Sequence, residues 1–304
     1  MQTTSLNLSA IILTYNEEIH IKRCIDSLVG IVDDIVVVDS NSSDSTLDIC
    51  KTYSQVRLFS RSWINYSDQF NWAIENTNIQ SDWIMRIDAD EYLSEELILN
   101  ISRCLISVSP DVSGIEYSRL IYFMNKPLRK GGMYPIWHTK IFRNGKGICE
   151  DRWMDERIIV NGKTIRIDGD VIDYNLNNIY WWISKHNGYA VREAIDNLNY
   201  KYNFWDNIHV LDKDLSGTNG SQRRLFKSLY LKLPLLLRPF FFWIFRYIFQ
   251  LGILEGKRGF IWNFFQCLWY RFLVDYTIIE IEEKSGGDID LMRKYIWDNY
   301  NYKI

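Results

Sequence analysis

Cysteine is scarce in this sequence, and its placement disfavours cross-linked folds. Five cysteines, an odd number, are spread along the chain without a C-x-x-C pair: Cys24, Cys50, Cys104, Cys149 and Cys267. A small secreted domain would need a dense disulfide framework, and a structural zinc site would need paired ligands. We expect neither, and the pattern is typical of a protein in a reducing cytosol.

Long apolar runs are absent as well. The chain has no stretch of about 18 uncharged apolar residues, the length that indicates an ordinary membrane-spanning helix. Residues 1–17 lack the positive start and long apolar core of a secretory signal. No Walker loop, G-x-G-x-x-G motif, Ser/His/Asp triad or internal repeat is visible, and a formal net charge of -3 argues against a basic nucleic-acid binder.

What the chain has is a globular composition with an uneven distribution of charge. Its 304 residues are 47% hydrophobic and 24% charged, which supports a buried core in one large or two modest domains. Residues 221–276 carry nine Lys/Arg against two acids, together with 17 of the 46 aromatic residues. This segment is therefore +7 and the remainder -10. We expect a catalytic domain over residues 1–220 and a basic aromatic helical region over residues 221–304.

Short β-branched runs alternate with helical spacing in the first third of the chain. Strands are predicted near residues 8–15, 35–38, 56–59 and 83–87. Helices are predicted near residues 21–29, 47–50 and 68–79 and from Ser94. Later strands are predicted near residues 114–124 and 138–143. This alternation predicts a doubly wound α/β fold with a mostly parallel sheet. Such sheets bind ligands beyond the carboxyl ends of their strands, where three polar clusters lie: residues 14–17, 39–44 and 88–91.

The third cluster contains a pair of acids that could hold a metal ion. Asp88 and Asp90 directly follow a buried strand, so both carboxylates could face one divalent cation. Hard oxygen ligands suit Mg²⁺ or Mn²⁺, with substrate phosphates completing the shell. The alternative is a solvated acidic turn before a helix.

The first two clusters could bind a nucleoside. Asp39 ends the second strand, where a carboxylate can accept a hydrogen bond from a nucleobase or a ribose hydroxyl. The end of the first strand could meet the same base through Thr14, Tyr15, Asn16 and Glu17. Candidate diphosphate or sugar contacts are Gln69, Asn71 and Arg86, with Arg61. Turn-forming, capping or solvated residues are the alternatives at each position.

Three ordered motifs closely resemble the family 2 glycosyltransferases with the GT-A fold: Ala10–Glu18, Ile35–Thr46 and Ile87–Glu91. The resemblance implies a Rossmann-like catalytic domain, a nucleotide-sugar donor with uridine diphosphate as the expected carrier, and an inverting transfer. It also implies that Thr14, Asn16, Glu17 and Asp39 hold the nucleoside, while Asp88 and Asp90 serve the metal, diphosphate and donor sugar. The second half more loosely resembles the branch similar to lipopolysaccharide-core glucosyltransferases, through Tyr134-Pro135, Lys140–Arg143, Asp155-Glu156, residues 181–186, Arg238-Pro239 and Tyr270-Arg271.

An inverting transfer needs a base that deprotonates the acceptor hydroxyl. The acidic stretch at residues 150–156 is the expected source. Asp155 and Glu156 stand where the branch commonly shows His-Glu, and they are favoured because a strand-like Arg157–Val160 and the turn Asn161-Gly162 follow them as in the branch. Asp151 stays open, since Glu150-Asp151 matches the Glu-Asp pair of other members, and all four acids could be surface charges. His186 could contact acceptor or diphosphate, although a packing histidine is the simpler interpretation.

The basic aromatic region is expected to bind an anionic membrane. Aromatic side chains on one helix face and cations on the other suit a helix that lies at the headgroup level. A buried core layer or an oligomer interface are the alternatives, but basic residues every few positions argue against full burial. We expect the segment to be divided into short helices at Pro234, Pro239, Gly252, Gly256 and Gly259. We therefore expect a cytoplasmic enzyme, peripherally attached to the inner face of a bacterial cell membrane, which glycosylates a lipid-linked glycan such as a lipopolysaccharide core, an O-antigen or a capsule repeat unit. A sugar nucleotidyltransferase and an inactive membrane-bound scaffold remain the competing functions.

Overall fold

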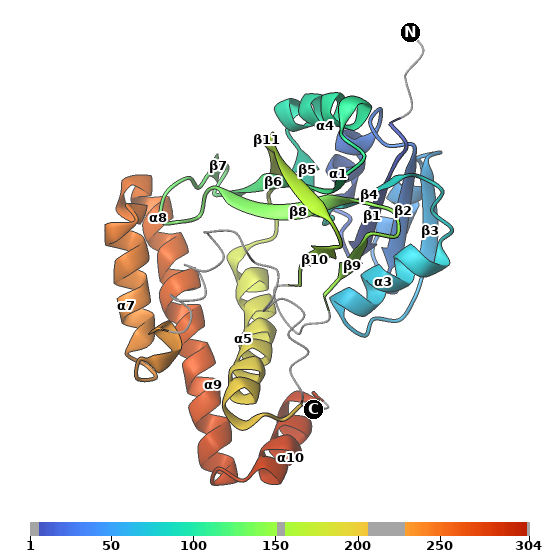
Figure 1. Ribbon diagram of the computed structural model, residues 1–304. Coiled ribbons are helices and arrows are strands. Elements are labelled where there is room, and N and C mark those ends of the chain that lie inside the picture. Colours follow the sequence, from blue (N-terminus) through green and yellow to red (C-terminus); the bar gives the residue numbers. More distant parts are fainter. Residues whose placement is uncertain (1–5, 151–155, 206–228, 303–304) are drawn as a thin grey trace. The chain divides into compact units, whose positions relative to one another are not determined.

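The computed structural model describes residues 6–150, 156–205 and 229–302 (Figure 1). The chain divides into two compact units, residues 1–176 and 177–304. The boundary expected from the sequence, residue 220, falls outside the described residues. Residues 179–202, which the sequence analysis assigned to the catalytic domain, form a helix of the second unit because their apolar face packs against the later helices.

The first unit alternates strands and helices as the sequence predicts. Its elements are β1 (Leu8–Thr14), α1 (Ile21–Leu28), β2 (Asp34–Asp39), α2 (Thr46–Lys51), β3 (Val56–Ser60), α3 (Tyr66–Asn76), β4 (Trp83–Arg86), β5 (Glu91–Leu93), α4 (Glu95–Ser107), β6 (Val112–Phe123), β7 (Lys126–Pro127), β8 (Ile136–Arg143), β9 (Gly147–Cys149), β10 (Ile158–Val160) and β11 (Lys163–Asp173). The predicted strands of the first third of the chain and the helix expected from Ser94 are confirmed. Ser94 caps α4 by accepting a hydrogen bond from Leu97 N.

Nine strands of the described residues form one sheet, along the path β3-β2-β1-β4-β8-β6-β11-β5, with β7 beside β6. The first four strands run parallel, and β8 continues the sheet antiparallel to β4. Strand β6 is antiparallel to β8 and parallel to β11. A separate hairpin pairs β9 with β10. The fold is the α/β, Rossmann-like architecture with a mostly parallel sheet that the resemblance implies, so the predicted fold class is confirmed.

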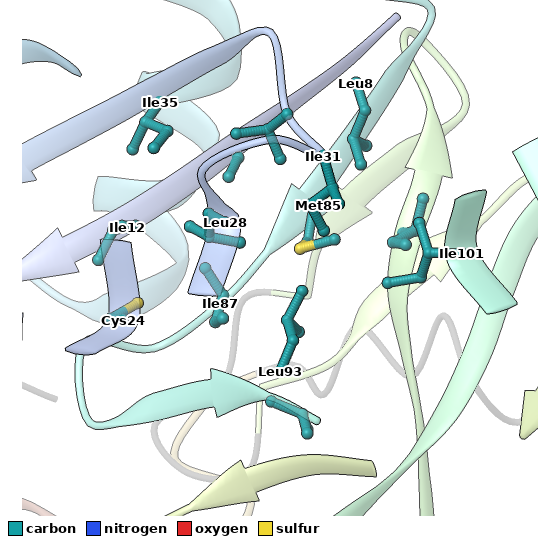
Figure 2. Close-up of a cluster of buried hydrophobic side chains, with 14 of the residues drawn as sticks. Leu8, Ile12, Cys24, Leu28, Ile31, Ile35, Met85, Ile87, Leu93 and Ile101 are labelled. Atoms are coloured by element: carbon teal, nitrogen blue, oxygen red, sulfur yellow. The ribbon is translucent and has the colours of Figure 1, made fainter. Parts of the chain in front are cut away.

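Helices cover the sheet on both faces, which explains the uninterrupted apolar strands (Figure 1). On one face, Cys24 and Leu28 of α1 pack against Ile12 of β1 and Met85 of β4 (Figure 2). On the other face, Phe70 of α3 packs in a second apolar cluster, which includes neighbouring residues of β1 and β2. Successive strand residues point to opposite faces, so a strand buried on both sides carries apolar residues at every position. This packing fixes where each parallel strand ends.

The second unit is helical. It contains α5 (Ile179–Tyr202), α7 (Arg238–Ile244), a π-helical turn η2 (Phe245–Phe249), a 3₁₀ turn η3 (Gly252–Glu255), α8 (Gly256–Asn263), a second π-helical turn η4 (Phe264–Trp269), α9 (Tyr270–Ser285) and α10 (Ile289–Tyr300). Asn178 caps the start of α5, which packs on α9 through Ala190, Ala194 and Leu198. As predicted, Gly252 and Gly256 lie where the aromatic segment breaks into short helices. Among the described residues, no helix is long and apolar enough to cross a bilayer.

One expectation about the second unit is corrected. The sequence suggested that the regularly spaced basic residues would avoid burial, but Arg238 is buried and its Nε donates to Oδ1 of the fully buried Asp275 at 2.7 Å. Arg271 forms an ion pair with Glu193 of α5. Each acid comes from a distant part of the chain, and its charge compensates the cost of burying the guanidinium group.

Candidate active site at the carboxyl edge of the parallel strands

Thr14 and Asp39 meet where β1 and β2 end. They are direct neighbours in the parallel register, and the Thr14 hydroxyl donates to Asp39 Oδ1 at 2.9 Å. Ser42 donates to both carboxylate oxygens of Asp39, from its hydroxyl at 2.5 Å and from its main-chain N–H at 2.7 Å. Asp39 is fully buried. These donors hold one carboxylate in a fixed orientation at the base of the expected nucleoside site.

The loops after β1 and β2 are joined to each other. The main-chain N–H of Asn16 donates to the Ser42 hydroxyl at 2.8 Å, and Asn16 Oδ1 accepts from the N–H of Ser43 at 2.8 Å. The N–H of Glu17 donates to the Thr46 hydroxyl at 2.8 Å. Asn16 has a φ of 55°, in the left-handed region that asparagine tolerates better than most residues. The side chain of Asn16 thus spans the gap between the two loops.

Tyr15 and Glu17 point to different environments within this loop. Tyr15 is 61% exposed, so its ring can cover a ligand at the edge of the sheet. The Glu17 carboxylate lies 2.6 Å from Nδ1 of the buried His20, whose Nε2 accepts from the N–H of Leu176 at 2.8 Å. Glu17 therefore orients His20 and, through it, the chain at Leu176. The sequence analysis did not single out His20, which lacks a motif of its own.

Asp88 lies in a network of cations and hydroxyls. Its Oδ1 accepts from the Tyr66 hydroxyl at 2.5 Å, and its Oδ2 lies 3.3 Å from Lys140 Nζ. Arg86 Nε is 3.8 Å from Oδ1. Burial by itself would raise the pKa of Asp88, but Lys140 and Arg86 outweigh it and hold the pKa below its usual range. Asp88 is therefore ionised and firmly oriented.

Asp90 is bound more loosely than Asp88. Its Oδ2 accepts from Asn175 Nδ2 at 3.0 Å, and its main-chain oxygen accepts from Arg23 Nη2 at 3.1 Å. Asp173, the last residue of β11, lies close enough for its pKa to be raised to about 7 by burial and then by the Asp90 charge. The sequence analysis missed Asp173, although an acid at a strand end was the signal that identified Asp39.

The acids at this edge could hold a divalent ion only together with further ligands. No group of three or more His, Cys, Asp or Glu side chains among the described residues is placed to hold a metal by itself. Asp90 offers a hard oxygen ligand of the kind that Mg²⁺ and Mn²⁺ use together with substrate phosphates. Both oxygens of Asp88 already have protein partners. These ligands therefore suit an ion whose coordination shell is completed by phosphate oxygens. Asp90 is the more available protein ligand, because its carboxylate has fewer protein partners than that of Asp88.

The acidic stretch expected to supply the base lies between β9 and β10. Asp151 and Asp155 fall outside the described residues. Glu156 is half-buried, and its main-chain oxygen accepts from Arg86 Nη1 at 2.9 Å. Arg86 thereby ties the end of this stretch to the end of β4, two residues before Asp88.

The polar atoms of Asn71 and Gln69 are occupied by protein groups. Asn71 Nδ2 donates to the main-chain oxygen of Cys149 and its Oδ1 accepts from the Cys149 N–H, both at 2.9 Å. Gln69 is fully buried and contacts Ser40 and Arg61. Asn71 therefore positions β9, and Gln69 positions the loop after β2. Both side chains support the expected donor site through these contacts.

His186 lies in the second unit. Its ring stacks on Trp182 with centroids 3.4 Å apart, and its Nδ1 lies 2.8 Å from the Trp182 main-chain oxygen. Burial lowers the pKa of His186 to about 4. These contacts favour the packing interpretation of this histidine.

Comparison with known proteins gives one consistent family. The model of "Glycosyl transferase family 2" matches residues 9–107. An uncharacterized glycosyltransferase of Rickettsia felis is 41% identical over 201 residues, which cover 62% of this chain and 69% of that protein. The lipopolysaccharide core biosynthesis glycosyltransferase LpsC of Rhizobium meliloti is 30% identical over 146 residues, covering 47% of this chain and 53% of LpsC.

A solved structure is similar over a shorter part. Glucosyl-3-phosphoglycerate synthase of Mycobacterium tuberculosis, in complex with Mn²⁺, uridine diphosphate and phosphoglyceric acid, is 22% identical with a TM-score of 0.30. The match covers 36% of this chain and 42% of the synthase, so the chain spans less than half of that protein.

Proposed function

Because this chain belongs to glycosyltransferase family 2, we propose that it transfers a sugar, with inversion, from a uridine diphosphate sugar to a lipid-linked glycan. The observation that carries this proposal is that Thr14 and Asp39 meet at the ends of β1 and β2, while Asp88 follows β4, the parallel strand on the other side of β1. An open parallel sheet binds its ligand at this edge.

The donor would lie along this edge. Asp39 is held by Thr14 and Ser42 and offers a carboxylate to a base N–H or a ribose hydroxyl, and the exposed ring of Tyr15 can stack on the base. Asp88 and Asp90 follow β4, the next strand, and the diphosphate and sugar would lie beside them. A Mg²⁺ or Mn²⁺ ion bound by Asp90 and phosphate oxygens would neutralise charge on the leaving diphosphate.

The cations around Asp88 suit its proposed role at the donor site. Lys140 contacts Asp88 and Glu91, which keeps Asp88 ionised and fixed. Arg86 contacts the Tyr66 hydroxyl and the main chain of Glu156. These contacts connect the donor side of the site to the acidic stretch that would supply the base, which we propose to be Asp155 or Glu156, with Asp151 as the alternative.

Membrane attachment is supported by an apolar surface on the second unit, here called the aromatic surface. Along α7 and η2, exposed side chains recur on one helix face: Phe240, Phe241, Ile244, Phe245, Ile248 and Phe249. A second row runs along α8, η4 and α9: Phe260, Phe264, Phe272 and Tyr276. The rows join where the Phe240 and Phe272 rings meet, with centroids 6.3 Å apart. Contiguous apolar surface of this kind is a typical membrane or partner contact.

The π-helical turn η4 helps to keep the second row straight. Residues four apart drift steadily around a regular α-helix, because a turn contains about 3.6 residues. A π-turn contains more residues and makes the drift run the other way. Phe260 precedes η4, Phe264 is its first residue and Phe272 follows it; they are separated by multiples of four residues, and all three side chains are exposed.

The charge of residues 221–276 stays clearly positive after its ion pairs are counted, because the sum of +7 already includes Asp275 and Glu255. Arg238 and Arg271 are used in ion pairs with Asp275 and Glu193. Arg258 contacts Glu255 at 3.5 Å. Of these three acids, Glu193 alone lies outside the segment, so the pairs lower the sum from +7 to +6. We therefore propose that burial of apolar side chains and attraction to anionic lipids act together in membrane binding, with attachment at the inner face of the bacterial cell membrane. The five free cysteines and the similarity to LpsC support a cytoplasmic enzyme of lipopolysaccharide core or related glycan synthesis.

A donor screen tests this function. Purified protein is incubated with a panel of nucleotide sugars, with a detergent-solubilised lipid-linked glycan, and with Mn²⁺, Mg²⁺ or EDTA, while release of nucleoside diphosphate is measured. We expect release from a uridine diphosphate sugar that requires both metal and acceptor. Release of pyrophosphate from a nucleoside triphosphate and a sugar phosphate would point to a nucleotidyltransferase instead. Nucleotide-sugar binding without turnover of any donor would point to a scaffold.

A further inference from the structure

Arg119 and His138 share one face of the sheet. His138 of β8 is opposite Tyr117 of β6, and Arg119 is opposite Ile136, two residues before His138. Residues opposite each other in a sheet share a face, as do residues two apart along a strand. Arg119 and His138 are therefore diagonal neighbours on the face that also carries Tyr117.

Each of these side chains has a buried nitrogen without a hydrogen-bond partner. Within the described part of the chain, Nε of Arg119 and Nε2 of His138 are both buried and unpartnered. The other contact found for Arg119 is an ion pair at 3.7 Å between its Nη1 and Asp173. Buried polar groups are normally satisfied, so two unmet nitrogens on diagonal neighbours of one face indicate a missing polar ligand.

The surroundings of His138 favour an anion. The pKa of His138 is lowered to about 2 by burial and by the positive charges of Arg119, Lys140, Arg157 and Arg86. His138 is therefore neutral, and it can donate from Nε2 when the other nitrogen carries no proton. A neutral donor beside a guanidinium, in a positive local field, is a suitable environment for an oxyanion.

The position of this pair within the sheet separates it from the nucleoside site. The strand order is β2-β1-β4-β8-β6-β11-β5, so Asp88, which follows β4, lies between the nucleoside loops and the strands that carry His138 and Arg119. Asp90 directly precedes β5, and its main-chain oxygen accepts from the N–H of Tyr174, just after β11. A donor that extends from Asp39 to Asp88 leaves the β8–β6 side for the acceptor.

We propose that Arg119 and His138 form a subsite for a phosphate or carboxylate group of the acceptor, so that the enzyme selects acidic glycans. The inference rests on the proposed function, because it takes the donor site to lie at β2, β1 and β4. Arg119 would bind the anion through Nε, and His138 would donate the second hydrogen bond. Both are binding residues in this scheme and neither takes part in proton transfer.

Inorganic phosphate is the probe that tests the subsite. Phosphate and, separately, acetate are titrated by calorimetry into the full chain saturated with uridine diphosphate and Mg²⁺. We expect phosphate to bind to this loaded protein, and Arg119→Gln and His138→Asn each to weaken its binding at least tenfold. Arg166→Gln is the matched control, since Arg166 is an arginine of the neighbouring strand β11 whose partner is Glu116 on the other face. It should bind phosphate like the wild type.

The outcomes separate the subsite from the proposed function. Tighter binding of phosphate than of acetate assigns a phosphorylated acceptor, and the reverse assigns a carboxylated sugar. Phosphate binding that disappears when uridine diphosphate saturates the protein would overturn the proposal, because the pair would then belong to the donor diphosphate. Equal binding by wild type and both variants, or no binding by the wild type, would overturn it too. Failure of every nucleoside diphosphate to bind, measured first in the same cell, would count against the proposed function alone.

Protein stability is checked in parallel. Thermal unfolding followed by circular dichroism shows whether each variant is folded before titration. If Arg119→Gln does not fold, His138→Asn decides the question, because it leaves the Arg119–Asp173 ion pair in place.

Discussion

Lys140 Nζ lies 2.8 Å from Oε2 of Glu91, and both side chains are almost completely buried. The same ammonium group lies 3.3 Å from Asp88. One cation from β8 thus compensates two acids that flank the turn after β4. Because burial of an unpaired charge is costly, this lysine determines whether the turn can carry both carboxylates at neutral pH.

Lys140→Met is expected to destabilise the protein by about 3–5 kcal/mol at pH 8, the usual cost of removing one partner of a buried ion pair. In the wild type the pKa of Asp88 is lowered, so its stabilising contribution is present at neutral pH and is lost only as the pH falls through that low value. Without Lys140, burial raises the pKa of both acids, and the variant should recover stability as the pH is lowered towards 5. Urea unfolding at several pH values measures the effect. Lys163→Met, which breaks an exposed pair with Asp111, should cost less than about 1 kcal/mol at every pH.

Asp90→Asn is expected to weaken Mn²⁺ binding in the presence of uridine diphosphate by at least tenfold, because Asp90 offers the less occupied carboxylate. Tyr66→Phe removes a hydroxyl from Asp88 and should change Mn²⁺ affinity much less. Electron paramagnetic resonance of free Mn²⁺ reports both affinities without relying on turnover. Equal losses in the two variants would mean that Asp88 is the main ligand.

Asp173→Asn is expected to change how stability depends on pH. The folded-state pKa of Asp173 is raised to about 7, mainly by burial and also by Asp90. A raised pKa means that the folded chain binds the proton more tightly than the unfolded chain, so this residue lowers stability as the pH rises from about 4 to about 7. The variant lacks this decline, and its stability relative to wild type should increase by up to about 1.4 kcal/mol per pH unit in that window. Denaturation in EDTA tests this, and parallel curves would contradict it.

Replacing Phe241 and Phe249 together by Ser should weaken binding to phospholipid vesicles at least tenfold. These side chains are 56% and 72% exposed, and burial of each in the lipid interface is worth about 1–2 kcal/mol. Trp297→Ser removes an aromatic residue of similar exposure, 51%, from α10, outside the aromatic surface, and should bind like wild type. Flotation at low and at high salt measures the loss. Binding by the wild type should also weaken at high salt, because residues 221–276 carry an excess of basic residues.

Arg238→Met should destabilise the helical unit by about 3–5 kcal/mol, since it leaves the buried Asp275 without its cation. The double variant with Asp275→Leu removes both charges and should regain most of the stability. Lys201→Met, which breaks an exposed pair with Glu282, is the control and should cost less than about 1 kcal/mol. Chemical unfolding of the full chain provides the comparison.

The parallel strands were predictable because the residues of each strand alone are enough to identify it. Ile35–Val38 is apolar at every position, which is how a strand covered on both faces reads, and the polar residue that follows marks the ligand edge. Strand β11 was not predicted: residues 164–167 alternate polar and apolar side chains, as a half-buried strand does, but Asp168-Gly169-Asp170 interrupts the pattern. The whole of Lys163–Asp173 forms a strand because it pairs with β6, about 50 residues earlier, across a register shift between Arg166 and Asp170.

The residues of the candidate site can also be divided into those that the local sequence identifies and those that it does not. Thr14, Asp39 and Asp88 could be selected from the sequence because each lies at or just beyond the end of an apolar run. Lys140, Asp173 and His138 acquire their importance from neighbours on other strands, which sequence spacing does not show. For the same reason, Arg238 was expected at the surface, because its partner Asp275 lies 37 residues away in the chain.

The hydrogen bonds between the loops after β1 and β2 have a consequence for the kinetics of nucleotide binding. Asn16 and Glu17 already bond to Ser42, Ser43 and Thr46 in the ligand-free chain. The nucleoside would thus enter a preorganised site and would not have to order either loop. Association should then be a single fast step whose rate rises linearly with nucleotide concentration. Asn16→Ala, which removes the side-chain bond to Ser43 and loosens the contact between the two loops, should add a slow phase that stopped-flow fluorescence can resolve.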